Sequence, residues 1–207
     1  MQFILMVLKM KNDNVVILLF FLWAFVVSCG TYKPNELINK GEELLVTNKG
    51  ELERIAILAN NLASDSCTMY QISTSNETDY FMFSEYNFNQ KENKVEQGNL
   101  ITCSEANKSE ILNSKVKNIT DINFVKNLYV SFVLDPYRNH SGNNAKLIYC
   151  FDKTKFQKLF PNYIFLNNKN SINENSAWVY FYDENWGITV SSTYYKKSKE
   201  ECLQMIK

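Results

Sequence analysis

Residues 135–140, Asp-Pro-Tyr-Arg-Asn-His, hold the densest group of side chains in the sequence that could do chemistry. Asp135 and His140, the single histidine of the chain, could act together in general acid–base catalysis, and Arg138 between them could hold an anion. The same residue types are common in ordinary turns, because Asp and Pro favour turn geometry. Neither a GxSxG nucleophile elbow nor a phosphate-binding glycine loop accompanies them. Asp135 and His140 are therefore weak candidates for a catalytic pair.

A second group consists of four cysteines, which are Cys67, Cys103, Cys150 and Cys202. In an exported protein an even number of cysteines permits two disulfides, and the sequence does not choose among the three possible pairings. Cys150 lies in an apolar stretch, so it could equally be a buried free thiol. The chain has no CxxC motif and only one histidine, and neither a zinc ribbon nor an HExxH site is supported. We expect no metal and no cofactor.

Aromatic residues near the C-terminus form a third group. In an extended strand, Trp178, Tyr180 and Tyr182 would share one face. Such a face either packs in the core or lies on the surface, where Tyr and Trp suit contacts with a protein or a glycan. Trp186, in the turn predicted after this strand, is the aromatic residue most strongly expected to be exposed. Core packing is favoured, and a binding face is kept as the alternative.

The N-terminal region carries a targeting signal. Residues 15–28 form a run of fourteen residues without a charge, preceded by Lys9 and Lys11. A membrane-spanning helix needs about 20 apolar residues, whereas the apolar part of a secretory signal has about 7–15. The run therefore predicts a signal peptide over residues 1–28. Met10 is an alternative start, because the sequence from Met10 is a compact signal by itself.

The end of this run, Val26-Val27-Ser28-Cys29, resembles the lipobox of bacterial lipoproteins. In that family the cysteine thiol receives a diacylglycerol, and a peptidase cleaves the chain before it. The resemblance implies that Cys29 is lipidated and becomes the first residue of an acylated (palmitate-bearing) protein anchored in the cell envelope. Residues 29–34 would then form a lipidated tether. An ordinary secretory signal, which would release a secreted protein, and a retained signal anchor are the alternatives.

Composition limits the classes to which the chain can belong. The 207 residues are 45% hydrophobic, and 22 basic side chains balance 22 acidic ones. This length suits one globular domain, which we place at residues 35–207. A nucleic-acid-binding protein would normally have an excess or a cluster of basic residues, so we expect no nucleic-acid partner.

Hydrophobic periodicity predicts the elements of this domain. Apolar residues at helical spacing indicate a helix over residues 36–46, and Asn48 with Glu51 predicts a capping box that starts a second helix up to residue 62. Strand patterns occupy residues 68–74, 80–88, 100–103, 129–134, 146–151, 163–166, 177–182 and 188–194. Shorter helices are expected over residues 120–128, 155–160 and 199–206, capped by Thr120, Asp152 and Ser198 respectively. Polar stretches at residues 89–98, 139–144 and 167–175 are predicted as loops.

The predicted fold class is α+β, with the N-terminal helical segment packed on a mainly antiparallel sheet of about seven strands and short helices between them. Two hypotheses of function follow. We favour a membrane-tethered envelope lipoprotein that acts as a non-catalytic binding module for a protein or glycan of the envelope. The alternative is a small envelope hydrolase that uses Asp135 and His140.

Overall fold

The computed structural model describes residues 31–65, 67–74, 81–89, 91–113, 116, 119–169, 177–191 and 197–206. From Tyr32 onward these residues belong to one compact unit. The predicted signal peptide, the alternative start at Met10 and the lipidation site Cys29 lie outside the described residues.

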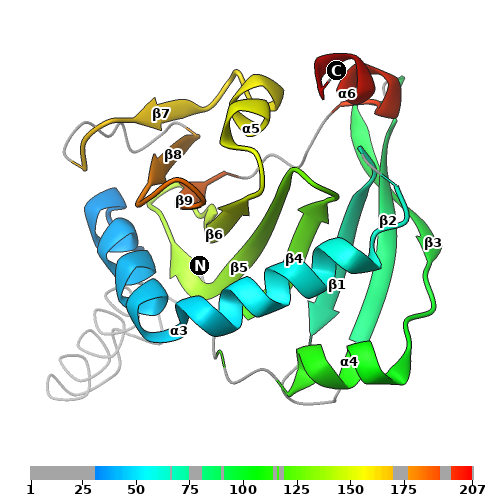
Figure 1. The fold of residues 1–207 in the computed structure, drawn as a ribbon. Helices are drawn as coiled ribbons and strands as arrows, with labels where there is room; N and C mark the ends of the chain where they lie inside the picture. Colours follow the sequence, from blue (N-terminus) through cyan, green and yellow to red (C-terminus); the bar gives the residue numbers. More distant parts are fainter. Residues whose placement is uncertain are drawn as a thin grey trace, which may run out of the picture. The chain divides into compact units, whose positions relative to one another are not determined.

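One sheet of nine strands organises the described residues (Figure 1). In chain order the strands are β1 (Met69–Thr74), β2 (Phe81–Asn89), β3 (Lys94–Leu100), β4 (Ile119–Val125), β5 (Tyr129–Arg138), β6 (Asn144–Cys150), β7 (Ile164–Leu166), β8 (Trp178–Phe181) and β9 (Trp186–Val190). Their spatial order is β3-β2-β1-β4-β5-β6-β9-β8-β7, and every neighbouring pair is antiparallel except β7 and β8. The predicted α+β class is confirmed, with nine strands in place of about seven.

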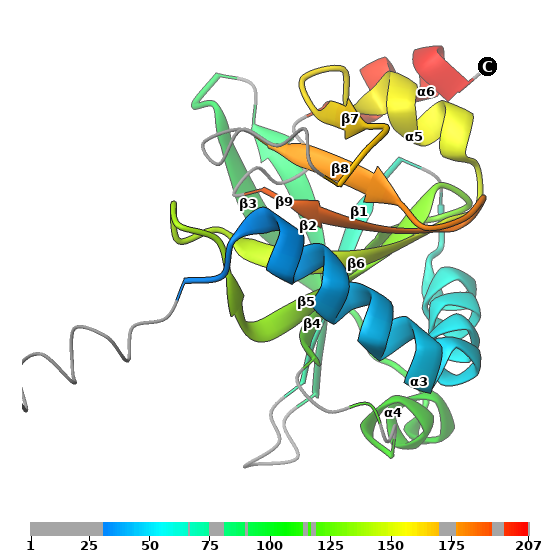
Figure 2. The same ribbon diagram turned by 90° about the vertical axis from the view of Figure 1, so that its left-hand side faces the viewer.

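Four helices among the described residues accompany the sheet: α3 (Pro34–Leu62), α4 (Glu105–Leu112), α5 (Lys153–Leu159) and α6 (Lys199–Ile206). Buried residues of α3, together with Ile111 of α4, share one hydrophobic cluster with the sheet. Residues of α5 and α6 share a second cluster with the opposite face. Figure 2 shows α3 on one side of the strands and α5 with α6 on the other. The sheet is therefore the middle layer of three.

The N-terminal helix is continuous, which corrects the prediction of a second helix capped by Asn48. Asn48 lies inside α3, where its side-chain amide donates to the carbonyl of Leu44 at 3.1 Å, and the Thr47 hydroxyl donates to the carbonyl of Glu43 at 2.9 Å. Hydrogen bonds of this kind, from a side chain back to the preceding turn, bend helices. The ribbon of α3 changes direction about midway, where its colour passes from blue to cyan (Figure 1). The polar pair thus bends one helix instead of starting another.

The packing of α3 on the sheet is close. Leu37, Leu52 and Ala59 are completely buried in the interface. The Tyr182 hydroxyl donates to the carbonyl of Ile38 at 2.6 Å, which ties the helix to the segment after β8. The predicted packing of the N-terminal helical segment on the sheet is confirmed.

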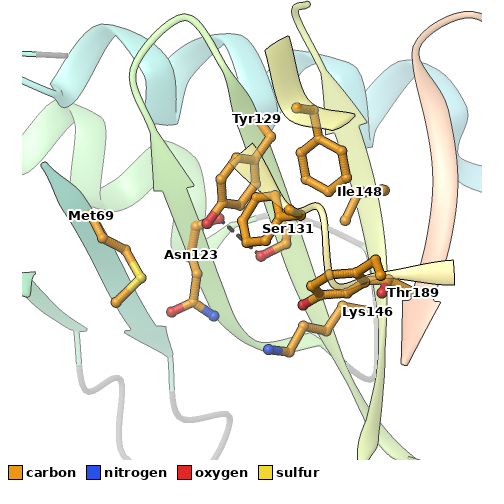
Figure 3. A pocket seen from close by; sticks show the side chains of 10 residues that line it. Met69, Asn123, Tyr129, Ser131, Lys146, Ile148 and Thr189 are labelled. Carbon is orange, nitrogen blue, oxygen red and sulfur yellow. Dashed lines mark hydrogen bonds between the residues drawn. The ribbon is translucent and has the colours of Figure 1, made fainter. Parts of the chain in front are cut away.

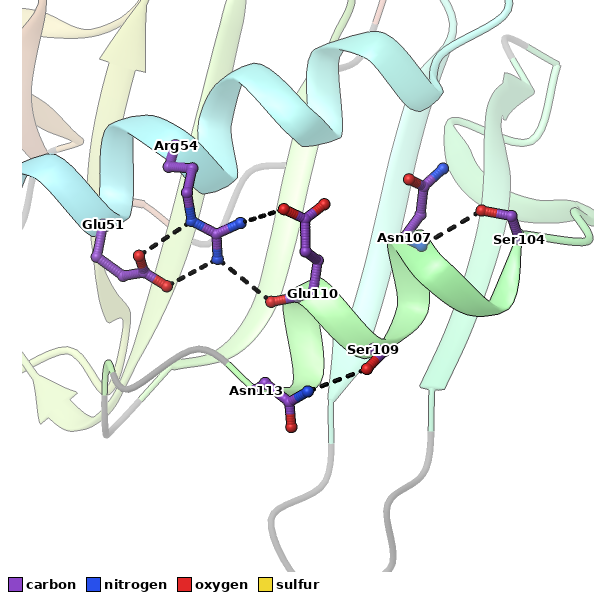
Figure 4. A network of polar contacts seen from close by, with 7 residues as sticks. All are labelled: Glu51, Arg54, Ser104, Asn107, Ser109, Glu110 and Asn113. Atoms are coloured by element: carbon purple, nitrogen blue, oxygen red, sulfur yellow. Dashed lines mark hydrogen bonds and ion pairs between the residues drawn. The ribbon is translucent and has the colours of Figure 1, made fainter.

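Arg54 fixes α4 against α3 (Figure 4). Its guanidinium donates to both carboxylate oxygens of Glu51, at 3.0 and 2.9 Å. It also donates to the carboxylate of Glu110 at 2.8 Å and to the backbone carbonyl of Glu110 at 3.3 Å. One side chain of α3 therefore holds the last turn of α4 by two separate contacts.

Two predicted elements are wrong. Residues 120–128 form β4 and a turn, and not a helix capped by Thr120. The apolar residues of β4 alternate, since Ile122 and Phe124 share one buried cluster, and this period of two is that of a strand. Residues 89–98, predicted as a loop, contain most of β3, whereas the predicted strand 100–103 includes only its last residue. The side chains of β3 are nearly all exposed, so its sequence has no hydrophobic alternation to detect.

Other predicted boundaries agree with the structure. Asp152 caps α5 by accepting a hydrogen bond from the backbone N–H of Lys155 at 2.9 Å. Ser198 caps α6 in the same way, with the N–H of Glu201 at 3.2 Å. The strands β8 and β9 form the expected antiparallel hairpin.

Candidate functional site

The central strands of the sheet have one apolar face and one polar face. The face toward α3 presents large buried residues, among them Ile72, Phe124, Phe132 and Leu147. Because side chains alternate along a strand, the residues between these point to the opposite face. That second face is where polar side chains gather.

Strand pairing arranges the residues of the second face in rows that run across the sheet. The first row joins Ser73, Asp121, Val133, Lys146 and Thr189 on β1, β4, β5, β6 and β9. The second row joins Gln71, Asn123, Ser131 and Ile148. The third row joins Met69, Val125, Tyr129 and Cys150. The first two rows are mainly polar, and the third is almost entirely apolar.

The helices on this side pack over the apolar row and reach the second row at Ile148. Phe156 and Leu159 of α5 and Cys202 of α6 belong to the same buried cluster as Val125 and Cys150. Figure 1 shows α5 and α6 at the same end of the sheet. The first row extends beyond this cover, toward the turn between β5 and β6.

Two adjoining cavities lie over the second face. The smaller, of about 30 Å³, lies between α5 and the sheet, and its wall includes Phe156, Phe160 and Tyr163. The larger, of about 280 Å³, is open to solvent and lies over the polar rows. Its lining consists of Gln71, Asp121, Asn123, Val133, Gly142, Asn143, Asn144, Lys146 and Ser191. Asn123 and Lys146 line both cavities and therefore mark their junction.

Figure 3 shows the junction from close by. The side chains of Asn123, from β4, and Lys146, from β6, extend toward each other over β5, the strand between them. Ser131 of β5 lies between them in the drawing, and its hydroxyl donates to the backbone carbonyl of Asn123 at 3.1 Å. The pocket floor thus combines an amide, a hydroxyl and an ammonium from three neighbouring strands.

Lys146 and Asp121 are the two charged side chains that line the larger cavity. Burial lowers the pKa of Lys146 below its ordinary value, and the negative charge of Asp121 opposes this shift. Asp121 is itself oriented by two hydrogen bonds to Oδ1, from the Gln71 amide at 2.8 Å and the Ser73 hydroxyl at 2.5 Å. The protein therefore keeps an opposite pair of charges in a partly desolvated hollow.

Asn123 has an unmet hydrogen-bonding capacity. Its side chain is 5% exposed, and its Oδ1 has no hydrogen-bond partner among the described residues. A buried acceptor without a partner costs about 1–3 kcal/mol, and native proteins usually satisfy such atoms with water or a ligand. Asn123 Oδ1 is therefore an acceptor left unsatisfied by the described residues and sealed beneath the pocket floor.

Asp135 and His140 lie away from this hollow. Both are exposed, Asp135 near the end of β5 and His140 in the following turn, and neither lines the two cavities above. Asn139 between them is completely buried. Its Oδ1 accepts hydrogen bonds from the backbone N–H groups of Ser141 and Asn143, at 3.1 and 3.0 Å. The segment thus builds a tight turn, as its residue types also suggested, and the turn supplies one wall of the larger cavity.

The aromatic group forms part of the core. Trp178 and Trp186 are 0% and 1% exposed, and both belong to the cluster beneath α3. Tyr180 and Tyr182 are partly buried against the same cluster. The expectation that Trp186 is exposed is wrong, because the hairpin turn ends before it and its side chain points under α3, where it stacks on Phe132. Of the two alternatives, core packing describes these residues.

The cysteines divide into one pair and two free thiols. A disulfide joins Cys67 to Cys202, while Cys103 and Cys150 are free. Cys150 is fully buried, and this burial strongly raises the pKa of its thiol, which keeps it protonated and unreactive. The alternative of a buried free thiol at Cys150 is therefore correct.

Among the described residues, no group of three or more His, Cys, Asp or Glu side chains is placed to hold a metal ion. In the same part of the chain no helix is long and apolar enough to cross a bilayer.

The sequence patterns do not single out the residues of the pocket. Asp121 and Asn123 lie in the segment predicted as a helix, and Lys146 lies in a predicted strand. A usable signal exists in both segments, since polar residues alternate with buried apolar ones in β4, and Lys146 stands between the buried Ala145 and Leu147.

Comparison with known proteins finds no matching family model, and no curated protein or solved structure is significantly similar to the chain.

Proposed function

We propose that the chain is a lipid-anchored binding module of the bacterial cell envelope and that its ligand site is the larger cavity on the second face of the sheet. The observation that carries this proposal is the open hollow over the polar rows, which is lined by Asp121, Lys146 and several amide side chains. Small-molecule sites typically combine a hollow with a few convergent polar groups.

The anchor in this proposal is Cys29. The uncharged run of residues 15–28 and the lipobox-like end support lipidation at this cysteine. The backbone N–H of Tyr32 donates to the carbonyl of Arg138 at 2.7 Å, so the chain is held to the domain three residues after Cys29. Three extended residues span about 10 Å. A lipidated Cys29 would therefore keep the domain close to the membrane surface.

The positions of Asp135 and His140 do not favour the hydrolase hypothesis. It requires Asp135 and His140 to face a common hollow, and neither side chain lines the cavities described above. The proposed function consequently rests on binding, with a protein or glycan of the envelope as the expected partner class.

Mass spectrometry of the full chain, purified in detergent from its native membranes, tests both parts of the proposal. The denatured mass should equal residues 29–207 plus a diacylglyceryl group, and an unlipidated product would show an ordinary secreted protein. Under native conditions a non-covalent adduct should be present and should be lost on denaturation.

A variant that fills the cavity supplies the control for binding. Val133 lies in the first polar row between Asp121 and Lys146 and lines the larger cavity, so V133F places a ring in the hollow. The adduct should be absent from V133F and present in a variant of an exposed residue elsewhere, such as V46F. Adducts of equal mass and amount in the wild type and V133F would contradict the proposed site.

A further inference from the structure

Two opposite charges stand on either side of an apolar residue in the larger cavity. Asp121 of β4, Val133 of β5 and Lys146 of β6 are neighbours in the first row, and all three line the cavity. Neighbouring strands of a sheet are about 4.8 Å apart, so the backbones of Asp121 and Lys146 are separated by about twice that spacing. The row thus presents a carboxylate, an apolar centre and an ammonium in sequence.

The ammonium of Lys146 would be stabilised by a second negative charge. Burial lowers the pKa of this lysine, and the carboxylate of Asp121 opposes that shift without cancelling it. The desolvation of the ammonium therefore exceeds its attraction to Asp121, and a carboxylate brought next to Lys146 would favour the charged form. An ammonium has three N–H bonds, so Lys146 can donate to such a ligand in addition to any contact within the chain.

Asp121 has an oxygen to which a ligand can donate. The Gln71 amide and the Ser73 hydroxyl both donate to Oδ1, and no hydrogen bond from the described residues reaches Oδ2. The two contacts at Oδ1 hold the carboxylate in one orientation. Oδ2 is therefore a preformed acceptor for a cationic group, and hydrogen bonds between ionised groups are stronger than those between neutral ones.

A ligand with a single charge does not suit this arrangement. An anion at Lys146 would face the carboxylate of Asp121, and a cation at Asp121 would face the ammonium of Lys146. Like charges repel strongly where water is partly excluded. A ligand with both an ammonium and a carboxylate meets an opposite charge on each side, and its aliphatic carbon can lie over Val133, which is 7% exposed.

The side chain of Lys146 sets the spacing of the two ligand charges. It extends over β5 toward β4 (Figure 3), so the gap between ammonium and carboxylate is shorter than the separation of the two backbones. A short gap favours two charges that are joined through a single carbon. The cavity volume of about 280 Å³ is just below the range of about 300–1,000 Å³ for small-molecule sites, and the opening to solvent leaves room for a ligand side chain.

We infer that the cavity binds the charged group of an α-amino acid, with the ligand ammonium donating to Asp121 Oδ2 and the ligand carboxylate accepting from the Lys146 ammonium. This inference rests on the proposed function and specifies its ligand chemistry. The group belongs either to a free amino acid or to the side-chain end of a larger envelope molecule, because both present an ammonium and a carboxylate on one carbon.

Isothermal titration of the full chain in detergent tests the inference with four probes: glycine, alanine, serine and glutamine. At least one should bind saturably with a Kd of about 1 mM or tighter. N-acetylalanine lacks the ammonium and alaninamide lacks the carboxylate, and each should bind about tenfold more weakly than alanine or not at all. γ-Aminobutyrate, whose charges are farther apart, should bind less tightly than the α-amino acids.

A tripeptide that ends in diaminopimelate distinguishes the two sources of the ligand group. Diaminopimelate carries an ammonium and a carboxylate on the last carbon of its side chain. Tighter binding of this tripeptide than of alanine would identify a larger envelope molecule, and equal or weaker binding would identify a free amino acid.

Variants connect the binding to the two charged residues. D121N keeps the size of the side chain and K146M keeps much of its length, and each should weaken binding of the tightest probe about tenfold or more. The matched controls D135N and K91M change exposed residues outside the cavities and should bind as the wild type does.

Four results would overturn the inference: saturable binding by none of the four amino acids, equal binding of N-acetylalanine or alaninamide, tighter binding of γ-aminobutyrate, or unchanged binding in D121N or K146M with the fold intact by circular dichroism. Other probes separate this failure from a failure of the proposed function. If glucose or succinate binds in place of the amino acids and V133F abolishes that binding, the amino-acid inference is overturned while the cavity stands as a binding site. If the native adduct is the same in wild type and V133F, the proposed site itself fails.

Discussion

Removing the disulfide should strongly destabilise the domain. Cys67 and Cys202 are 135 residues apart in the sequence, and both are at most 3% exposed. In the chain-entropy model a cross-link over this separation restricts the unfolded chain by about 5 kcal/mol, and the measured cost of losing native disulfides is about 2–5 kcal/mol. In a domain of this size 5 kcal/mol corresponds to a fall in Tm of about 10–20 °C.

The remaining contacts of α6 cannot replace the covalent link. Lys199 pairs with Asp65, but both side chains are more than 40% exposed, and such pairs contribute about 0–1 kcal/mol. Met205 and Ile206 add only partly buried packing. We therefore expect α6 to separate from the domain first when the disulfide is absent.

Urea unfolding of the full chain checks this prediction in three forms: C67A/C202A, the wild type under a reducing agent, and C103A as the control. The double variant and the reduced wild type should lose the same stability, and C103A should unfold like the oxidised wild type because Cys103 is free. Hydrogen exchange should show the amides of α6 losing protection first. A double variant within about 0.5 kcal/mol of the wild type, which is the range of ordinary surface substitutions, would refute the reasoning.

Three other predictions concern buried groups. Burial lowers the pKa of Lys146 in the folded state, so at pH values just below the ordinary lysine pKa the unfolded state binds more protons than the folded state. The free energy of unfolding should therefore rise with pH in that range. Urea titrations between pH 7 and 10 should show this rise in the wild type and not in K146M. In native protein a maleimide should modify the partly exposed Cys103 and spare the buried Cys150 until urea is added, and equal labelling would contradict the burial of Cys150. A Cβ at Gly41 would collide with the Tyr182 hydroxyl, so G41A should cost about 1–3 kcal/mol in urea unfolding, whereas G50A, where nothing is near, should not destabilise.

The fold class could be predicted because most helices and strands have a sequence signal that lies within a few residues of the element itself. The caps Asp152 and Ser198 and the alternation in β1 and β8 act within a few residues, and the structure has these elements close to their predicted bounds. The wrong predictions arise where a local sequence signal is compatible with two structures or is absent. Asn48 is a good cap residue that here bonds back into its own helix, and the strand β3 at the edge of the sheet has no buried side to reveal it.

The burial of Trp186 could not be predicted from the sequence for a different reason. The positions of Trp178 and Trp186 fix which face of a strand they occupy, but not which face of the sheet the long helix α3 covers. Both indole N–H groups are buried without a hydrogen-bond partner among the described residues. Burial without a partner opposes the usual tendency of a Trp indole N–H to find a hydrogen-bond partner, and this tendency is the reason for expecting Trp186 to be exposed.

The position of the candidate site follows from the length of the helix beside it. Successive rows on one face of a sheet are about 7 Å apart, because side chains repeat every second residue. The helix α5 has seven residues, and a helix of that length spans about 10 Å. It can therefore cover one or two rows, whichever way it lies, and the apolar row of Met69, Val125, Tyr129 and Cys150 is the one it covers with α6. The rows of Asn123 and Lys146 fall at and beyond its edge, so the same strands that build a dry core under α5 open into a polar hollow one step further along.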